Sequence, residues 1–235
     1  MSPSIHARTS ALIVGVAIVL AAYFLADAAR DVKFGDRHVT VKGLAERTVT
    51  ADWVVWPLSF SVSHNDLQGL QSALEQNTET VIAYLMLNGF DEAEINRAAP
   101  RIVDLHAQSW GNDQPRTRFN ATVTITVQSP KVDAAKAAMA SAGDLIGEGV
   151  ILAETYGPSA QFLFNGLNDI KPDMIASATK NARAAAEQFA RDSNSQVGGI
   201  RRAKQGVFTI SERDINSPET KIVRVVSTID FYLVD

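Results

Sequence analysis

The sequence contains no cysteine. This absence excludes structural disulfides, thiol catalysis and cysteine-ligated zinc or iron–sulfur centres. The four histidines are too far apart for the spacing that zinc ligands show along a chain, since they stand at positions 6, 38, 64 and 106. We therefore predict that the protein holds no metal ion and needs no cofactor.

Basic residues are also scarce relative to acidic ones. The chain has 22 Lys and Arg against 26 Asp and Glu, which gives a formal net charge of −4 at pH 7. A nucleic-acid surface needs a dense patch of Lys and Arg, so no nucleic-acid partner is predicted. We interpret the one tight basic cluster, Arg201, Arg202 and Lys204, as a solvated strand flank.

Catalytic motifs are absent as well. The sequence has no nucleophile elbow, no phosphate loop and no dinucleotide fingerprint. Gly147-Glu148-Gly149 lacks the following glycine and lysine of a phosphate loop and precedes a predicted strand, so we interpret it as a turn. From these absences we predict that the protein is not an enzyme.

What the chain does contain is one long apolar run, residues 11–26, which reads ALIVGVAIVLAAYFLA. As a helix this run would rise ~24 Å, and its extension at both ends brings it close to the ~30 Å of a bilayer core. Arg8 precedes the run, so the N-terminus is expected to stay cytoplasmic. The alternative is a cleaved signal peptide, for which Ala26-Asp27-Ala28 has the form of a cleavage site.

The apolar run sets the predicted domain organisation. We expect one N-terminal transmembrane helix, acting as a signal anchor, followed by a short charged linker and one exported domain. The predicted segments are a cytoplasmic N-terminus over residues 1–10, the anchor over 11–29, the linker over 30–37 and the exported domain over 38–235.

The clearest strand pattern lies in residues 38–63, which read HVTVKGLAERTVTADWVVWPLSFSVS. From Trp53 onward the residues alternate as in a half-buried strand, and Trp56 shares one face with Leu58 and Phe60, which is predicted to face the core. Gly43 is expected to bend or bulge the strand before it. Pro57 lacks a backbone donor, so an edge position or a bulge is expected there. This stretch predicts a nucleus of two long strands.

The rest of the chain alternates strands with helices. Helices are predicted over 67–87, 131–142 and 173–192, with Asp66 as N-cap of the first and Met174, Ala178, Ala182, Ala185 and Phe189 as the apolar stripe of the last. Strands are predicted over 95–109, interrupted near Pro100, and over 116–129, 151–164, 200–211 and 221–234. The order β-β-α-β-β-α-β-α-β-β predicts an α+β fold with mixed or antiparallel sheets and helices packed on one face.

The opening motif resembles that of a known family. Val41, Gly43, Ala45 and Glu46, then Ala51-Asp52 and an alternating strand, are similar to the start of the SIMPL-domain (DUF541) family of bacterial cell-envelope proteins. The likeness continues through Arg118-Phe119-Asn120-Ala121 to the C-terminus. It implies structural roles for Gly43, Glu46 and Asp52, and a periplasmic domain on the inner membrane. It also implies an envelope role linked to oxidative-stress defence, with no agreed biochemical activity.

Three functional hypotheses remain open. The first is a non-enzymatic, membrane-anchored envelope protein that forms a homo-oligomer through strand edges and apolar outer faces, with Trp53 as a possible interface contact. The second is a periplasmic small-molecule or peptide binder with an unknown ligand, in a cleft near Trp110 and the strand of Phe162 and Phe164. The third is an enzyme with an unrecognised site, for which Asp52, Glu46 and His106 are the candidates. Asp52 is better interpreted as a backbone acceptor at a strand boundary.

Overall fold

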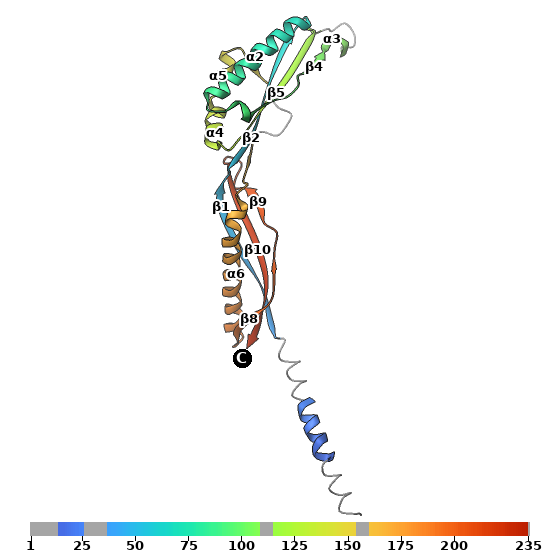
Figure 1. The fold of residues 1–235 in the computed structure, drawn as a ribbon, viewed down its shortest axis with the longest axis vertical. Helices are drawn as coiled ribbons and strands as arrows, with labels where there is room; N and C mark the ends of the chain where they lie inside the picture. Colours follow the sequence, from blue (N-terminus) through green and yellow to red (C-terminus); the bar gives the residue numbers. More distant parts are fainter. Residues whose placement is uncertain (1–13, 26–36, 109–114, 154–159, 235) are drawn as a thin grey trace, which may run out of the picture. The chain divides into compact units, whose positions relative to one another are not determined.

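The computed structural model describes residues 14–25, 37–108, 115–153 and 160–234. The chain, drawn in Figure 1, divides into two compact units. Three of the four boundaries fall within β1, α6 and β10, and the fourth falls immediately before β9. The α6 unit comprises residues 1–45, 173–208 and 225–235, and the α2 unit comprises residues 46–172 and 209–224.

The α2 unit is built on an antiparallel sheet with β2 and β5 at its centre (Figure 1). Its strands are β2 (Trp53–His64), β3 (Ile95–Arg97), β4 (Arg101–Asp104), β5 (Phe119–Ser129), β6 (Ile151–Leu152) and β7 (Gln161–Leu163). The helices are α2 (Leu67–Leu87), α3 (Leu105–Gln108), α4 (Val132–Ser141) and α5 (Asp144–Gly147), with a 3-10 turn at Glu92–Glu94. Apolar side chains of β2 and β5 alternate inward and meet those of α2, α4 and α5 in one core.

A second sheet has the order β1-β10-β8, and β9 also pairs with β10. Its strands are β1 (His38–Thr50), β8 (Gln196–Gln205), β9 (Thr209–Glu212) and β10 (Thr220–Val234). In the α6 unit, α6 (Leu167–Asp192) packs on this sheet through Ala182 and Ala186, which meet Val41, Ile229 and Phe231. The α+β prediction is therefore confirmed, and the sheets are antiparallel rather than mixed.

The described part of the N-terminal apolar run forms a helix over residues 14–25. Its side chains are exposed, including Val19, Tyr23 and Phe24. Among the described residues, no helix combines the length and the apolar character needed to cross a membrane. Both ends of the predicted anchor, residues 11–13 and 26–29, lie outside the described residues.

The prediction that Pro57 marks an edge strand or a bulge is wrong. β2 is a central strand, with β5 along one side and both β6 and β7 on the other. β7 pairs with residues 53–55 of β2 and β6 pairs with residues 60–61, so Pro57 lies between the two short partners. Its missing N–H is tolerated because neither partner needs a donor at that position.

Several predicted boundaries also differ from the structure. The interruption predicted near Pro100 is confirmed, since Ala98-Ala99-Pro100 separates β3 from β4, but residues 105–108 form α3 and not the end of the predicted strand over 95–109. The predicted strand over residues 200–211 is divided into β8 and β9, and α6 begins at Leu167 rather than at residue 173. Phe189 is 59% exposed, because the buried stripe of α6 continues from Ala182 to Ala186 and Ala190, and Phe189 is turned away from it.

Candidate functional site

Asp52 fixes the chain that leads into α6. Its carboxylate accepts the backbone N–H of Asn165 at 2.8 and 3.0 Å, and that of Gly166 at 2.8 Å. Its own N–H donates to Leu163 O at 2.9 Å. A carboxylate beside a helix N-terminus is also favoured by the helix dipole. The structure thus gives Asp52 the backbone-acceptor role, although its partners lie more than a hundred residues along the chain and not nearby in sequence.

Gly43 lies where α6 approaches β1 most closely. A Cβ atom at this position would lie 1.8 Å from Ala178 O and 2.6 Å from Ala182 N, closer than side chains tolerate. The Asn181 side chain donates to Leu44 O at 2.8 Å in the same contact. β1 continues through Gly43 without interruption, so the predicted bend or bulge is wrong. The position requires glycine because a helix backbone occupies the space of a side chain.

The three enzyme candidates lie in separate contacts. Glu46 Oε1 is 3.6 Å from Arg224 Nε, in a half-exposed ion pair. His106 Nε2 is 3.0 Å from Pro115 O. Within the described part of the chain, no hydrogen bond or ion pair joins any two of Glu46, Asp52 and His106. In that same part, no group of three or more His, Cys, Asp or Glu side chains is arranged to hold a metal ion.

Of the three tryptophans, one lies in the core, one is half-buried on the sheet, and one lies outside the described residues. Trp56 is 7% exposed and belongs to the core of the α2 unit, as expected from its face of the strand. Trp53 is half-buried and lies opposite Leu163 of β7. Trp110, the predicted exposed contact, lies outside the described residues.

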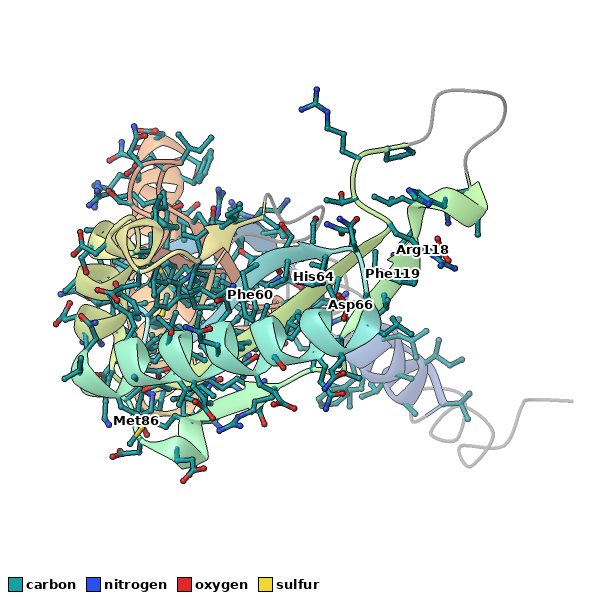
Figure 2. All side chains as sticks on the ribbon, turned by 90° about the horizontal axis from the view of Figure 1, so that it is seen from above. Phe60, His64, Asp66, Met86, Arg118 and Phe119 are labelled. Atoms are coloured by element: carbon teal, nitrogen blue, oxygen red, sulfur yellow. The ribbon has the colours of Figure 1, made fainter. Side chains whose placement is uncertain are left out.

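The Arg118-Phe119-Asn120 motif joins the start of β5 to the turn before α2 (Figure 2). Arg118 donates through Nε and Nη2 to Asp104 Oδ2 at 3.2 and 3.1 Å, and its guanidinium lies 4.8 Å from the Phe119 ring centroid. The Arg118 hydrogen bond, partly opposed by desolvation, lowers the pKa of Asp104 below its usual range. Arg118 N also donates to Asn65 Oδ1 at 3.1 Å, so this motif has a structural role.

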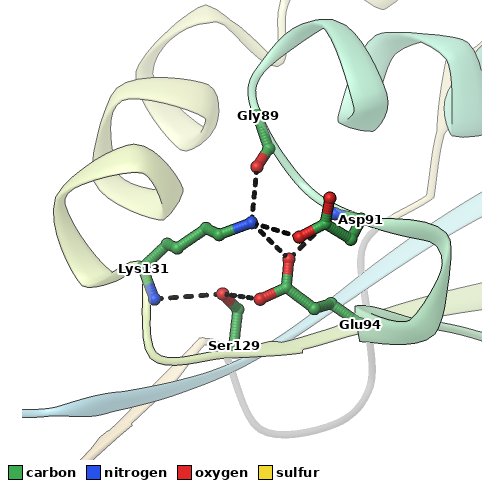
Figure 3. Close-up of polar contacts among 5 residues, drawn as sticks. All are labelled: Gly89, Asp91, Glu94, Ser129 and Lys131. Carbon is green, nitrogen blue, oxygen red and sulfur yellow. Dashed lines mark hydrogen bonds and ion pairs between the residues drawn. The ribbon is translucent and has the colours of Figure 1, made fainter.

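A polar cluster joins the end of α2 to the start of α4 (Figure 3). Lys131 Nζ donates to Gly89 O at 2.9 Å, to Asp91 Oδ2 at 2.7 Å and to Glu94 Oε2 at 2.9 Å. Ser129 Oγ donates to Glu94 Oε1 at 2.7 Å. Burial alone would raise the pKa of Glu94, but the bonds from Asp91 N, Ser129 and Lys131 outweigh it and the pKa is lowered. This cluster holds two connections in place and is not arranged around a ligand.

The β7/β9 groove, of about 570 Å³, lies between two strand edges of the α2 unit. Its lining includes Phe162, Phe164, Asn165, Ile210, Glu212 and Lys221. Lys221 has a side chain only 8% exposed, and its Nζ lies 3.1 Å from Glu212 Oε1. The sequence predicts Phe162 and Phe164 beside a cleft, but this prediction does not include Lys221. Its position two residues before Val223, on the buried face of β10, was the available signal.

The α2 groove, of about 610 Å³, lies between α2 and the β3–β4 segment. Its floor is apolar and includes Leu70, Leu74, Ile102 and Val123. Glu75 and Glu79 lie on its α2 wall, and Arg97 lies on the opposite wall. No pattern in the sequence predicts this groove, because its walls come from segments whose proximity only the folded sheet creates.

Comparison with proteins of curated function found none that matches this chain. Comparison with protein families matches residues 39–224 to the family described as SIMPL, a protein of unknown function (DUF541). The matched segment includes Gly43, Glu46, Asp52 and the Arg118 motif, and it covers most of the 235 residues. The chain therefore belongs to the SIMPL (DUF541) family.

Proposed function

We propose that this SIMPL-family chain is a non-enzymatic protein of the bacterial cell envelope that assembles with copies of itself. In this proposal the N-terminal segment anchors the chain in the inner membrane, and the SIMPL domain faces the periplasm. The observation that carries self-assembly is the open edge of β8. This strand pairs with β10 and with no other described strand, and residues 199–205 are all exposed.

An open strand edge presents unpaired backbone donors and acceptors, which are a template for pairing with another chain. β8 is ten residues long, so its edge is longer than that of β3, β4 or β7. Large apolar side chains are also exposed in the same unit, including Phe189 at 59% and Val207 at 85%. Such features support an assembled state rather than an isolated monomer.

The membrane anchor is supported by the apolar run of residues 11–26 and by the exposure of its described part. Val14, Ile18 and Leu25 of the helix over residues 14–25 are all more than half exposed, so no described core covers them. A helix that is apolar all round requires an apolar environment. The bilayer provides that environment if the helix extends through residues 11–29.

A role in envelope and oxidative-stress defence is part of this proposal. The chain has no cysteine, so it has no thiol with which to reduce an oxidant. Its contribution to such defence would therefore be indirect, through a structure that it forms in the envelope.

The test is the native mass of the full-length protein, extracted from membranes in mild detergent, together with the intact mass of its polypeptide. The proposal expects a discrete oligomer with the N-terminus retained. A strict monomer at high protein concentration would contradict self-assembly. A polypeptide that lacks its first ~25–30 residues would contradict the anchor and favour a cleaved signal.

The β7/β9 groove favours a second candidate function, the binding of a periplasmic small molecule or peptide. It combines aromatic side chains with a nearly buried Lys221 that is paired with the exposed Glu212, and its β7 side carries Leu163 opposite Trp53. A bound ligand would therefore alter tryptophan fluorescence. Titration with a panel of metabolites and short peptides should then show quenching that Phe164→Ala abolishes and Phe189→Ala, a change outside the groove, preserves. No response across the panel would contradict this function.

A further inference from the structure

Charge is divided unevenly between the two units. Among the described residues, the α6 unit has eight Lys and Arg against four Asp and Glu, a formal charge of +4. The described residues of the α2 unit have 11 Lys and Arg against 16 Asp and Glu, a formal charge of −5. The net charge of −4 for the whole chain conceals this division. Two copies therefore attract each other when unlike units meet.

Three of the eight described basic residues of the α6 unit lie on one face of its sheet, which we name the basic face: Lys42, Arg202 and Lys204. Arg202 lies opposite Asp230 in the register of β8 and β10, and Lys204 lies opposite Thr228. Asp230 accepts the Thr40 hydroxyl at 2.8 Å, which places Thr40 and therefore Lys42 on the same face. All three cations are exposed. The carboxylate of Asp230 thus lies on the same face as the three cations.

This charge disfavours pairing between two β8 edges. In an antiparallel pair of β8 strands centred on Ala203, Arg202 and Lys204 of one copy would lie across from Lys204 and Arg202 of the other. Like charges on facing strands are destabilising. The β8 region of one copy consequently favours an acidic surface of a second copy over the β8 edge of that copy.

The α2 groove has an acidic wall that matches this face. Glu75 and Glu79 are exposed and are the only charged side chains of α2. They are one helical turn apart, a rise of ~6 Å. Arg202 and Lys204 are two residues apart on a strand, a separation of ~6.6 Å. The two spacings allow both ion pairs to form together.

Ile200, which precedes the basic pair, lies opposite Phe231 in the register of β8 and β10, on the side of the sheet that faces α6. The contact with the groove therefore depends on the two ion pairs and not on this apolar side chain. Arg97 on the opposite wall repels the basic strand and so directs it toward α2.

We propose that the basic face of one copy docks on the α2 wall of the α2 groove in a second copy. This inference rests on the self-assembly proposed above and names the two surfaces that meet. Because they are different surfaces, the contact is heterologous, and each copy keeps one free surface of each kind. Such a contact produces a closed ring when its rotation closes and a filament when it does not.

The test uses two charge-reversed variants of the full-length protein. One is Arg202→Glu with Lys204→Glu, and the other is Glu75→Lys with Glu79→Lys. Native mass is measured by light scattering in mild detergent. For each variant alone, the protein concentration at which half of the assembly has dissociated should be higher than for the unchanged protein, on the order of tenfold or more. The reason is that two attractive ion pairs become repulsive. High salt should also raise the concentration at which the assembly of the unchanged protein dissociates, because it screens the ion pairs.

Assembly should return when the two variants are mixed, and also in one chain that carries all four changes, because the reversed surfaces attract each other again. Lys180→Glu with Arg191→Glu is the matched control, since it changes the charge of the α6 unit equally but on exposed positions of α6. Assembly that survives both reversals, or that fails to return in the fourfold variant, overturns this contact and leaves self-assembly intact. A monomeric unchanged protein contradicts self-assembly itself.

Discussion

The two long helices of this protein pack on their sheets in opposite ways. α2 inserts large side chains into its core, including Leu74, Val81 and Leu85. α6 presents alanines, Ala178, Ala182 and Ala186, and comes so close to β1 that only glycine fits at position 43. The first interface is stabilised by the volume that it buries, and the second by close approach of two backbones. The α6 interface should therefore be destabilised when a side chain is enlarged, and the α2 interface when a side chain is shortened.

The largest effect is expected when a side chain is added at the α6 interface. Gly43→Ala would place a methyl group against the Ala178 carbonyl, and backbone cannot give way as a side chain can. We expect a loss of more than about 3 kcal/mol in the free energy of unfolding, measured by urea denaturation. Gly199→Ala in β8 is the matched control, because its Cβ would meet open space. Similar losses in both variants would contradict close packing at Gly43.

Removal of a large side chain, the opposite change, should destabilise the α2 interface. Leu85 is fully buried, so Leu85→Ala leaves a cavity and is expected to cost about 2–3 kcal/mol. Leu87 is two residues away and 88% exposed, and Leu87→Ala should change stability by less than about 0.5 kcal/mol. Denaturant titration of the two variants measures the difference. Equal effects would show that the α2 face assigned to the core is wrong.

The starts of the two helices provide a smaller contrast. Asp66 caps α2 from the adjacent position, and its Oδ1 accepts Gly69 N at 2.7 Å. Asp52 holds the approach to α6 from a distant strand through three hydrogen bonds. Asp52→Ala should cost about 2 kcal/mol and Asp66→Ala about 1 kcal/mol, both in urea unfolding. Asp52→Asn keeps one acceptor oxygen and should fall between the unchanged protein and Asp52→Ala.

Acid should weaken the α2 unit selectively. The lowered pKa of Glu94 means that its contribution to stability is complete above its usual value of 4.5 and is lost as the pH falls through the lower folded value. Asp66 and Asp104, with lowered pKa values, belong to the same unit. Hydrogen-exchange protection, measured relative to the intrinsic exchange rate at each pH, should therefore be lost first around Gly89 and Lys131 as the pH falls. Glu94→Gln should reduce this pH dependence, and an equal loss of protection in both units of the unchanged protein would refute the contrast.

Local patterns in the sequence were sufficient to predict the elements whose boundaries and faces depend on neighbouring residues. α2 was predicted from 67 to 87 with Asp66 as its cap, and the structure agrees at both ends. The inward face of β2, with Trp56, Leu58 and Phe60, was also predicted correctly. Alternation and helix capping arise from neighbouring residues, so they can be read without tertiary contacts.

Predictions failed where the cause lay far along the chain. Pro57 indicated an edge strand, but it stands between two short partners contributed by residues about a hundred positions away. Gly43 indicated a bend, but the backbone of α6 is what requires it. Lys221 and the α2 groove were missed for the same reason, since their neighbours come from other strands.

The sequence by itself determined the secondary structure, the family and the absence of thiol chemistry. Periodicity, capping residues and composition depend on residues near one another, and a single chain displays them directly. The tertiary structure alone decided which backbones meet at Gly43, which carboxylate holds the start of α6, and that Glu75 and Glu79 border an apolar groove. These depend on contacts between distant segments, which form only when burial of the two cores offsets the entropy of bringing them together.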